Sequence, residues 1–403
     1  MSSCKEAFVK TSAIAFALTL VLAGSASPGG AQTATYTIPV ILSQTGAAAA
    51  PGQDQLAALQ AYEKLVNRTG GIRGEQLHFQ IYDDASSPQT AVQLTNTILA
   101  AKPAVVFGST LAPATTAMMP FFKDGPVLYS LTPLVYPEKG SWVFATLPLI
   151  QHVESVMFRY MRGRNWTKVA FLRTNDVSGQ DNEKAIDAAL AEPDNRSIVT
   201  TTKQLFNVAD INIAAQVSAV KFSGAQAIFV SATGAPFGMV MRSLADAGVD
   251  IPIFTGATNI APAFIERFKQ YVPKSGLWIV FPSYAKRDRA ARDPLRATID
   301  EFYTTLEASG QRPGAEHAFA WDGAKIVVAA LRALGPAATS QQIHEWIESL
   351  HDFPGALGLY NFRIGDQHGL DDKSLYIVRY DPNAPNGNAE IVSEAGGVPL
   401  RTR

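Results

Sequence analysis

Cysteine is almost absent from this 403-residue chain, since Cys4 is the only one. Disulfide bridges are therefore excluded, and so is a catalytic or metal-binding thiol beyond the first residues. A chain of this size does not need such bridges, because 47% of its residues are hydrophobic and can fill cores of ordinary size. Its length predicts two globular lobes.

An excess of one charge is also lacking. Lys and Arg number 34 against 35 Asp and Glu, which gives a formal net charge of -1, and no long run of one sign occurs. A nucleic-acid partner requires a basic face or stripe. The charge balance therefore argues against DNA or RNA as a partner.

The chain lacks the short motifs that mark common enzyme classes. It contains no H-E-x-x-H, no G-x-S-x-G nucleophile elbow, no P-loop and no G-x-G-x-x-G. Its six histidines show no zinc-binding spacing. We therefore expect no catalytic residues, no metal and no other cofactor, and we predict that the protein is not an enzyme.

Only one long hydrophobic run is present, and it lies near the start of the chain. Lys5 and Lys10 precede a run from Thr11 to Ala23, and small residues follow up to Ala31. This length is typical of a secretory signal peptide and is below the roughly 20 apolar residues that span a membrane. No cysteine follows the run, so a lipid anchor is not expected. We predict a cleaved signal peptide at residues 1–31 and a periplasmic protein.

From Tyr36 onward, short apolar segments alternate with helical patterns. Strands are predicted at residues 36–42, 77–84, 104–108, 126–130, 168–173, 225–231, 251–256, 275–284, 357–364 and 374–380. Helices are predicted at residues 53–68, 87–101, 237–247, 294–309, 315–333 and 340–350, the second of them with Ser87 as N-cap and Pro88 at its first position. This alternation indicates parallel sheets with both faces covered by helices.

Three features are candidate functional elements. Asp83 and Asp84 are adjacent at a strand end and point in opposite directions, so we expect them to support the structure rather than to react as a pair. The loop from Phe107 to Ala117 joins a strand end to a helix start, where backbone N–H groups can bind an anion. Arg173 ends a strand and is either a surface residue or a ligand contact.

Four segments resemble the periplasmic leucine/isoleucine/valine-binding protein family, the type I solute-binding proteins of ABC importers. They are SQTG at 43–46, NRTGGIRGEQLHFQIYDDASSPQTAV at 67–92, VFGS at 106–109 and AWDGAKIV at 320–327. The likeness extends over about residues 36–381. It implies an α/β fold with two Rossmann-like lobes and parallel-rich sheets, joined by three crossover segments around a solute-binding cleft.

The resemblance also implies a division of the chain. Residues 36–147 and 284–355 would form the N-terminal lobe, residues 148–283 and 356–381 the C-terminal lobe, and residues 382–403 a loose tail. In this family the Asp83–Asp84 pair belongs to the scaffold.

Four positions depart from the amino-acid binders of this family. Pro51 stands where they usually have an aromatic residue, Ala112 and Leu134 where they have hydroxyl residues, and Thr258 where they have the acid that pairs with the ligand's ammonium. An unpaired buried ammonium costs several kcal/mol, whereas a micromolar complex has only about 8 kcal/mol in total. We therefore expect a carboxylic acid without an amino group, with aromatic acids among the candidates. If Asp176 or Asp181 reaches the cleft, an amino acid or amide is the ligand instead.

The expected ligand contacts lie at strand ends and at the positions that the resemblance indicates. They are Pro51, Thr110, Leu111, Ala112, Thr132, Pro133, Leu134, Arg173, Ser178, Thr233 and Thr258. The expected partners are a small-molecule solute and the membrane permease of an ABC importer, with the protein itself a monomer. The alternatives are a branched-chain or other amino-acid or amide binder, and a ligand sensor of the same fold coupled to a regulator.

Overall fold

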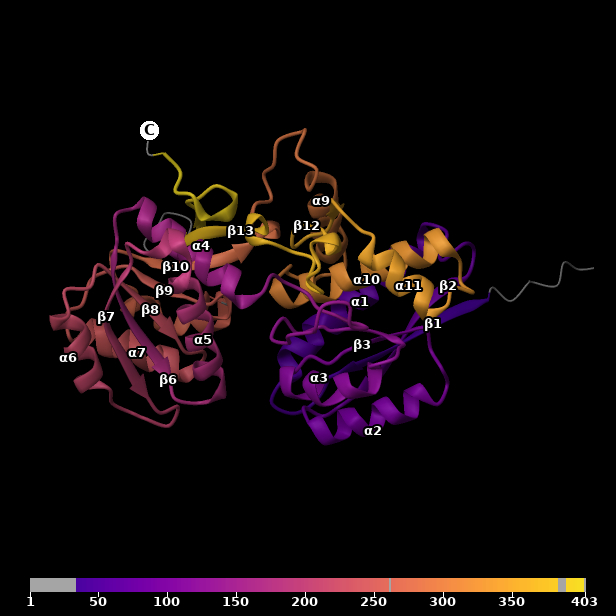
Figure 1. The fold of residues 1–403 in the computed structure, drawn as a ribbon, viewed down its shortest axis with the longest axis horizontal. Helices are drawn as coiled ribbons and strands as arrows, with labels where there is room; N and C mark the ends of the chain where they lie inside the picture. Colours follow the sequence, from indigo (N-terminus) through magenta and orange to yellow (C-terminus); the bar gives the residue numbers. More distant parts are fainter. Residues whose placement is uncertain (1–33, 261, 383–388, 402–403) are drawn as a thin grey trace, which may run out of the picture.

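The computed structural model describes residues 34–260, 262–382 and 389–401. Figure 1 shows two lobes side by side, with the first lobe on the right, the second on the left and the links between them near the top. The expected signal peptide, residues 1–31, lies outside the described residues. No helix in the described ranges is long and apolar enough to cross a bilayer.

The first lobe is built on a five-stranded parallel sheet in the order β2-β1-β3-β4-β5. Its strands are β1 (Thr35–Leu42), β2 (Gln76–Asp83), β3 (Val105–Phe107), β4 (Val127–Tyr129) and β5 (Val143–Phe144). Its helices are α1 (Ala49–Arg68), α2 (Pro88–Leu99), α3 (Ala112–Met118), α9 (Arg296–Ala308), α10 (Ala315–Leu334) and α11 (Ser340–Glu348). One core lies between the sheet and α1, α9, α10 and α11, and a second lies between the sheet and α2 and α3.

Local sequence signals account for the start of two of these helices. The Ser87 hydroxyl accepts a hydrogen bond from the Thr90 N–H at 3.3 Å, with Pro88 at the first helical position of α2, as the sequence predicts. α1 begins at Ala49, four residues before the predicted start at 53, and so includes Pro51. Proline is tolerated there because the first-turn N–H groups have no partner within the helix.

The second lobe is built on a seven-stranded sheet in the order β14-β13-β10-β9-β8-β6-β7. Its strands are β6 (Lys168–Thr174), β7 (Val199–Phe206), β8 (Ala227–Ser231), β9 (Ile253–Thr255), β10 (Leu277–Pro282), β13 (Leu375–Tyr380) and β14 (Ala389–Ile391). β13 and β14 run antiparallel at one edge, and the other strands are parallel. Its helices are α4 (Ile150–Gly163), α5 (Val177–Ala191), α6 (Ala214–Phe222), α7 (Ala235–Asp246) and α8 (Pro262–Phe268).

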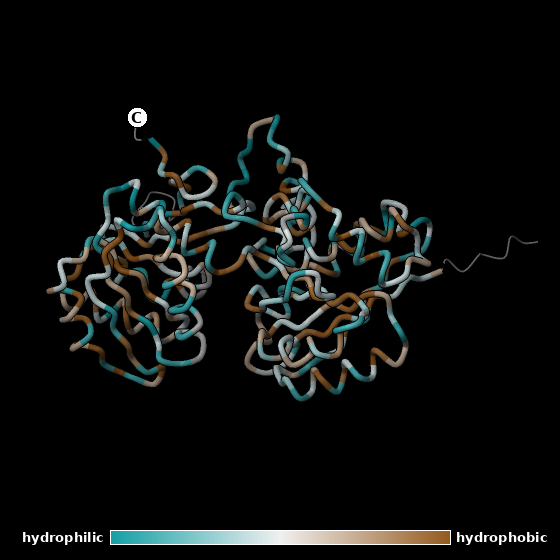
Figure 2. The backbone as a smooth tube through the Cα atoms, viewed as in Figure 1, coloured by the Kyte–Doolittle hydropathy of each residue, from teal (hydrophilic) through white to brown (hydrophobic). Residues whose placement is uncertain are grey.

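Each lobe has its own hydrophobic interior. α4 and α5 pack on one face of the second sheet, and α6 and α7 pack on the other. Figure 2 shows hydrophobic stretches inside both lobes and hydrophilic ones along their outer turns. The chain passes between the lobes three times, after β5, after β10 and before β13. The two-lobe α/β fold with three crossovers is therefore confirmed.

Two late segments differ from the sequence-based division. Residues 356–370 were expected in the second lobe, but Ala356, Leu357, Tyr360 and Leu370 are buried in the core of the first. The reason is Asp322 on α10, whose carboxylate accepts hydrogen bonds from the N–H groups of Ala356 and Leu357 at 2.7 and 2.8 Å.

The strand predicted at 357–364 is correspondingly short. β12 (Leu359–Tyr360) forms a hairpin with β11 (Phe353–Pro354), and a 3-10 turn follows at Phe362–Ile364. β11 and β12 are each two residues long and pair with each other, so β12 is not a strand of the second sheet.

The tail expected to be loose is packed in its described part. β14 pairs with β13 and covers the edge of the second sheet. The Arg159 guanidinium donates to the Gly396 carbonyl at 2.5 Å and forms an ion pair with Asp372 at 2.6 Å. Residues 389–401 are therefore part of the second lobe.

Candidate functional site

The carboxyl ends of the parallel strands define the candidate site. β5 of the first sheet and β10 of the second both run directly into crossovers, so the carboxyl ends of both parallel sheets lie on the side where the lobes are joined. Ligands of open α/β sheets bind outside these ends. The candidate site is therefore the region between the two sheet edges.

On the first lobe, Gln55 links three loops at this edge. The Ser43 N–H donates to Thr110 Oγ1 at 3.2 Å, and the Thr110 hydroxyl donates to Gln55 Oε1 at 2.9 Å. Gln55 Nε2 donates to the Leu131 carbonyl at 2.9 Å. Ser43, Gln55 and Thr110 are all buried. Thr110, an expected ligand contact, thus holds the loops together with its hydroxyl.

The adjacent acids Asp83 and Asp84 stabilise the loops at the same edge of the first sheet through hydrogen bonds. Asp84 is fully buried and accepts from the hydroxyls of Ser43 and Ser109, which follow β1 and β3. Asp83 accepts from the N–H groups of Gln44, Thr45 and Ala85 and from the Thr45 hydroxyl, and these hydrogen bonds lower the pKa of its carboxyl. The pair faces two different sets of donors, as expected for a structural role.

Several expected ligand contacts lie at this edge of the first lobe. Leu111 and Ala112 start α3 and are half-buried. Thr132 is buried, and its Oγ1 accepts from the Leu134 N–H at 3.4 Å. The side chains of Pro51 and Pro133 are half-buried, whereas Leu134 is 48% exposed. These residues therefore lie in α1, at the start of α3 and in the loop after β4, and Leu134 keeps an apolar side chain exposed there.

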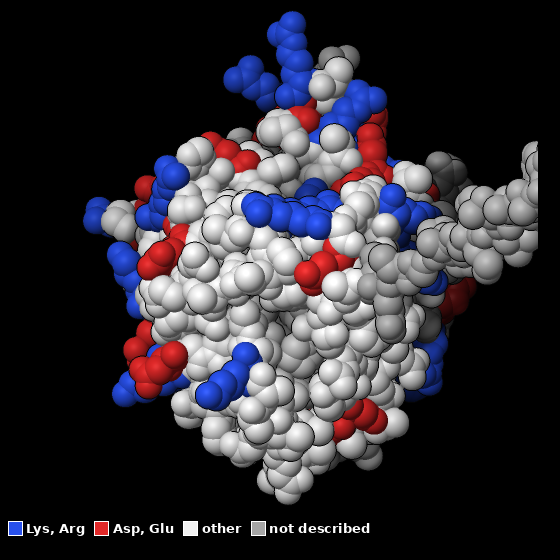
Figure 3. Space-filling view, turned by 90° about the vertical axis from the view of Figure 1, so that its right-hand side faces the viewer, with Lys and Arg blue, Asp and Glu red and all other residues white. Residues whose placement is uncertain are grey.

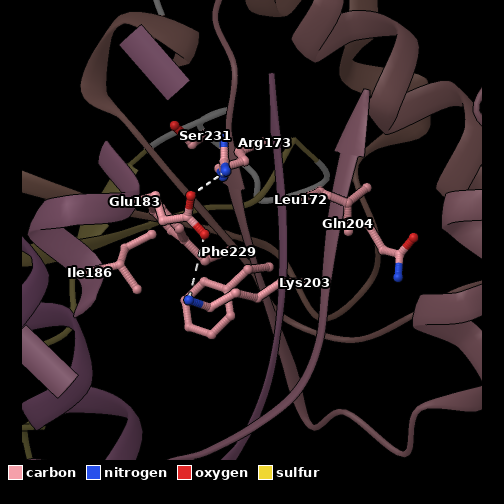
Figure 4. A pocket seen from close by; sticks show the side chains of 9 residues that line it. Leu172, Arg173, Glu183, Ile186, Lys203, Gln204, Phe229 and Ser231 are labelled. Atoms are coloured by element: carbon pink, nitrogen blue, oxygen red, sulfur yellow. Dashed lines mark hydrogen bonds and ion pairs between the residues drawn. The ribbon is translucent and has the colours of Figure 1, made fainter. Parts of the chain in front are cut away.

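On the second lobe, Arg173 turns toward α5. Its guanidinium forms an ion pair with Glu183, which also lies 3.6 Å from the Lys203 ammonium. Figure 4 shows the Arg173 guanidinium and the Lys203 ammonium both directed at the Glu183 carboxylate, in a pocket that Ile186 and Phe229 also line. The charge of Arg173 is thus balanced within its own lobe.

The other expected contacts on the second lobe are of two kinds. Thr233 is exposed in the loop after β8. The side chains of Ser178 and Thr258 lie outside the described part of the structure. Asp176, an alternative acid for the ligand, caps α5, because its Oδ1 accepts from the Gly179 N–H at 3.0 Å and from the Thr174 hydroxyl at 2.7 Å.

Three residues at the first-lobe edge escaped the sequence analysis: Gln55, Glu316 and His317. Gln55 Nε2 also donates to Glu316 Oε2 at 2.7 Å, which joins the start of α1 to the start of α10. Burial, reinforced by the nearby Asp54 charge, raises the pKa of Glu316 to about 7. None of the three residues belongs to a sequence motif. From the sequence alone they look like polar residues on the exposed face of a helix.

Two further observations concern the surface charge of the first lobe and possible metal ligands. Figure 3 shows both signs of charge scattered over the viewed face, which belongs to the first lobe. Within residues 34–260, 262–382 and 389–401, no group of three or more His, Cys, Asp or Glu side chains could hold a metal ion.

Comparisons with known sequences give one consistent family. A profile described as periplasmic binding protein matches residues 35–388. The chain is 26% identical over 251 residues to Leu/Ile/Val-binding protein homolog 3 of Brucella melitensis, over 61% of this chain and 66% of that one. It is 27% identical over 212 residues to the leucine-, isoleucine-, valine-, threonine-, and alanine-binding protein of Pseudomonas aeruginosa, over 51% and 56%. Both matches span less than two thirds of the relative.

Solved structures show the same fold. An extracellular ligand-binding receptor from Rhodopseudomonas palustris has a TM-score of 0.74 at 22% identity, with 89% of this chain and 100% of that chain covered. The branched-chain amino acid transporter substrate binding protein from Streptococcus pneumoniae, in complex with isoleucine, has a TM-score of 0.69 at 20% identity, with 89% and 99% covered.

Proposed function

Since this chain belongs to the periplasmic binding protein family, we propose that it captures a small organic solute between its lobes and delivers it to an ABC importer. The observation that supports this is the arrangement of two sheet edges on the side where three crossovers join the lobes. A hinge motion at such crossovers closes the lobes around the solute, and the closed form is presented to the membrane permease. We propose that the carrier acts as a periplasmic monomer without turnover.

The proposed ligand is a carboxylic acid without an amino group. In the β6–α5 region of the second lobe, Asp176 caps a helix and Glu183 is paired with Arg173 and Lys203. Asp176 and Glu183 are thus engaged within the lobe, and the side chain of Asp181, the other acid named in the sequence analysis, lies outside the described part of the structure. An ammonium left unpaired in the site would cost several kcal/mol. The exposed Leu134 provides an apolar contact for a hydrocarbon or aromatic part.

The proposed polar contacts come from both lobes. Thr132 on the first lobe and Thr233 on the second each lie in a loop that follows a strand, while Ser178 is in the first turn of α5 and Thr258 is in the 3-10 turn after β9. Leu111, Ala112, Pro51 and Pro133 would line the first-lobe side.

The experiment is thermal unfolding of the mature protein, refolded to remove bound solute, against a ligand panel. The panel contains leucine and other amino acids, small amides, aliphatic acids and aromatic acids. A ligand at a hundred times its Kd stabilises the protein by about 2.7 kcal/mol, which gives a clear rise in Tm. We expect acids lacking an amino group to raise Tm and to be recovered unchanged by mass spectrometry. A rise with leucine or valine alone would assign the protein to amino-acid transport instead.

A further inference from the structure

An acidic cluster at the starts of α1 and α10 has not yet been assigned a part in ligand binding. It consists of Asp54 on α1 and Glu316 and His317 on α10. The two helices run in the same direction, because Gln55 near the start of α1 donates to Glu316, and Arg332 near the end of α10 donates to the carbonyls of Val66 and Gly71. Since α1 follows β1, both helix starts lie at the ligand-facing edge of the first sheet.

The hydrogen bonds around Glu316 leave one carboxyl oxygen available. Gln55 Nε2 donates to Glu316 Oε2, while Gln55 Oε1 accepts from the Thr110 hydroxyl. Gln55 thereby fixes the orientation of the Glu316 carboxyl. Among the described residues, Gln55 is the only hydrogen-bond partner of that carboxyl.

His317 gives an independent indication that a polar partner belongs here. The residue is only 4% exposed, yet neither Nδ1 nor Nε2 has a hydrogen-bond partner in the described structure. Buried polar atoms are paired in the large majority of cases, and an exception calls for a ligand, ion or water. Two polar groups with open positions therefore lie at the start of α10, and each of them interacts electrostatically with Asp54 on α1.

The charges around Glu316 favour its neutral form. The Asp54 charge on α1 acts on Glu316, whose own charge acts on Tyr284 in the crossover segment Ser283–Ala285, and His317 follows Glu316 on α10. Burial and the Asp54 charge raise the pKa of Glu316 to about 7, whereas burial lowers the pKa of His317. Near neutral pH, Glu316 therefore exchanges a proton while His317 stays neutral.

We propose that Glu316 is a specificity-determining residue whose protonated Oε1 donates a hydrogen bond to an anionic oxygen of the ligand. This inference rests on the proposed function and assigns a further contact to the same site. A neutral carboxyl can donate to a carboxylate, whereas an ionised one repels it. When Glu316 is ionised in the empty protein, binding of the organic acid takes up one proton from solvent.

The proton uptake fixes the sign of the pH dependence. A simple carboxylic acid is fully ionised above pH 6 and Glu316 is not, so affinity is highest at low pH. Above about pH 7 the affinity decreases, with a limiting slope of tenfold for each pH unit, because one proton accompanies each ligand. If the ligand presents an ammonium to Glu316 instead, its affinity should increase with pH.

The test measures Kd by calorimetry between pH 6 and 8.5, using the acid with the largest Tm shift in the panel. We expect E316Q to keep the wild-type affinity at pH 6, because an amide N–H can replace the carboxyl O–H, and to lose the decrease at high pH. In wild type above pH 7, buffers of different ionisation enthalpy should report uptake of up to one proton for each ligand, and in E316Q none. In D54N the decrease in affinity should begin at a lower pH, because the substitution removes a charge that raises the pKa of Glu316.

E345Q is the matched control, because Glu345 on α11 accepts from the Gln341 amide at 2.7 Å on an exposed surface. It should retain the wild-type pH profile, and thermal unfolding checks that each variant is folded. A pH slope that persists in E316Q, or an affinity that rises with pH, would overturn the role of Glu316 while leaving solute binding intact. If no compound in the panel raises Tm, the proposed function itself fails, and the Glu316 contact fails with it.

Discussion

At the scale of single residues, the exposed Leu134 at the candidate site is the side chain best placed for an apolar contact with the ligand. Leu134 follows β4 and keeps 48% of its surface exposed beside the buried Thr132. Scattered exposed leucines are normal in soluble proteins, but this one lies at a sheet edge where ligands bind. Closure of the lobes over a ligand would remove it from water.

We expect L134S to weaken ligand binding about tenfold with little change in Tm of the empty protein. Burying a leucine side chain contributes about 1.5–3 kcal/mol when complete, and roughly half of this surface is available for burial. L400S is the control, because Leu400 is 41% exposed in the tail of the second lobe. Equal ligand affinity in both variants, measured by calorimetry, would remove Leu134 from the site.

At the scale of elements, the position of α1 against β1 determines the geometry of the first-lobe edge. Gly52 lies in the first turn of α1, where a Cβ atom would come 1.9 Å from the Ser43 carbonyl oxygen and 3.3 Å from Thr110 Oγ1. Only a residue without a side chain allows this approach. The close approach places Gln55 within reach of Thr110, Leu131 and Glu316.

We expect G52A to destabilise the protein by about 1–3 kcal/mol, because the clash must displace either α1 or the loop after β1. Ligand affinity should also decrease, since the Gln55 network shifts with the helix. G256A provides the control, as nothing lies within 4 Å of a Cβ at Gly256. Urea unfolding measures both variants, and equal midpoints would show that the helix relaxes without penalty.

At the scale of the whole molecule, the two lobes have separate cores and are joined by three crossovers. Such an arrangement permits hinge closure, and a ligand drives it only by binding the closed form more tightly than the open form. The lobes can therefore move as bodies while each core stays packed.

We expect saturating ligand to lower the radius of gyration in small-angle X-ray scattering. Each sheet keeps its own helices on both faces, so closure changes the distance between the lobes and not their internal structure. A compound from the panel that leaves Tm unchanged is the control and should leave the radius unchanged. A ligand that raises Tm at constant radius would indicate binding within one lobe.

The sequence by itself determined the α/β class, the two lobes and most element positions. These follow from the apolar periodicity, from caps such as Ser87, and from a resemblance carried by segments such as residues 67–92. Local patterns suffice for them because hydrogen bonding within a helix and alternation along a strand depend on near neighbours. The structural role of Asp83 and Asp84 could be predicted for the same reason.

Only the tertiary structure decided where long-range partners meet. Asp322 holds residues 356 and 357 in the first lobe across more than thirty positions, and Gln55 reaches Glu316 across 261. Arg173 looked available at a strand end, yet Glu183 on the next helix neutralises it. Hydrogen bonds and ion pairs between distant segments leave no periodic trace in a sequence, so the acidic cluster at the ligand edge emerged only when the chain was folded.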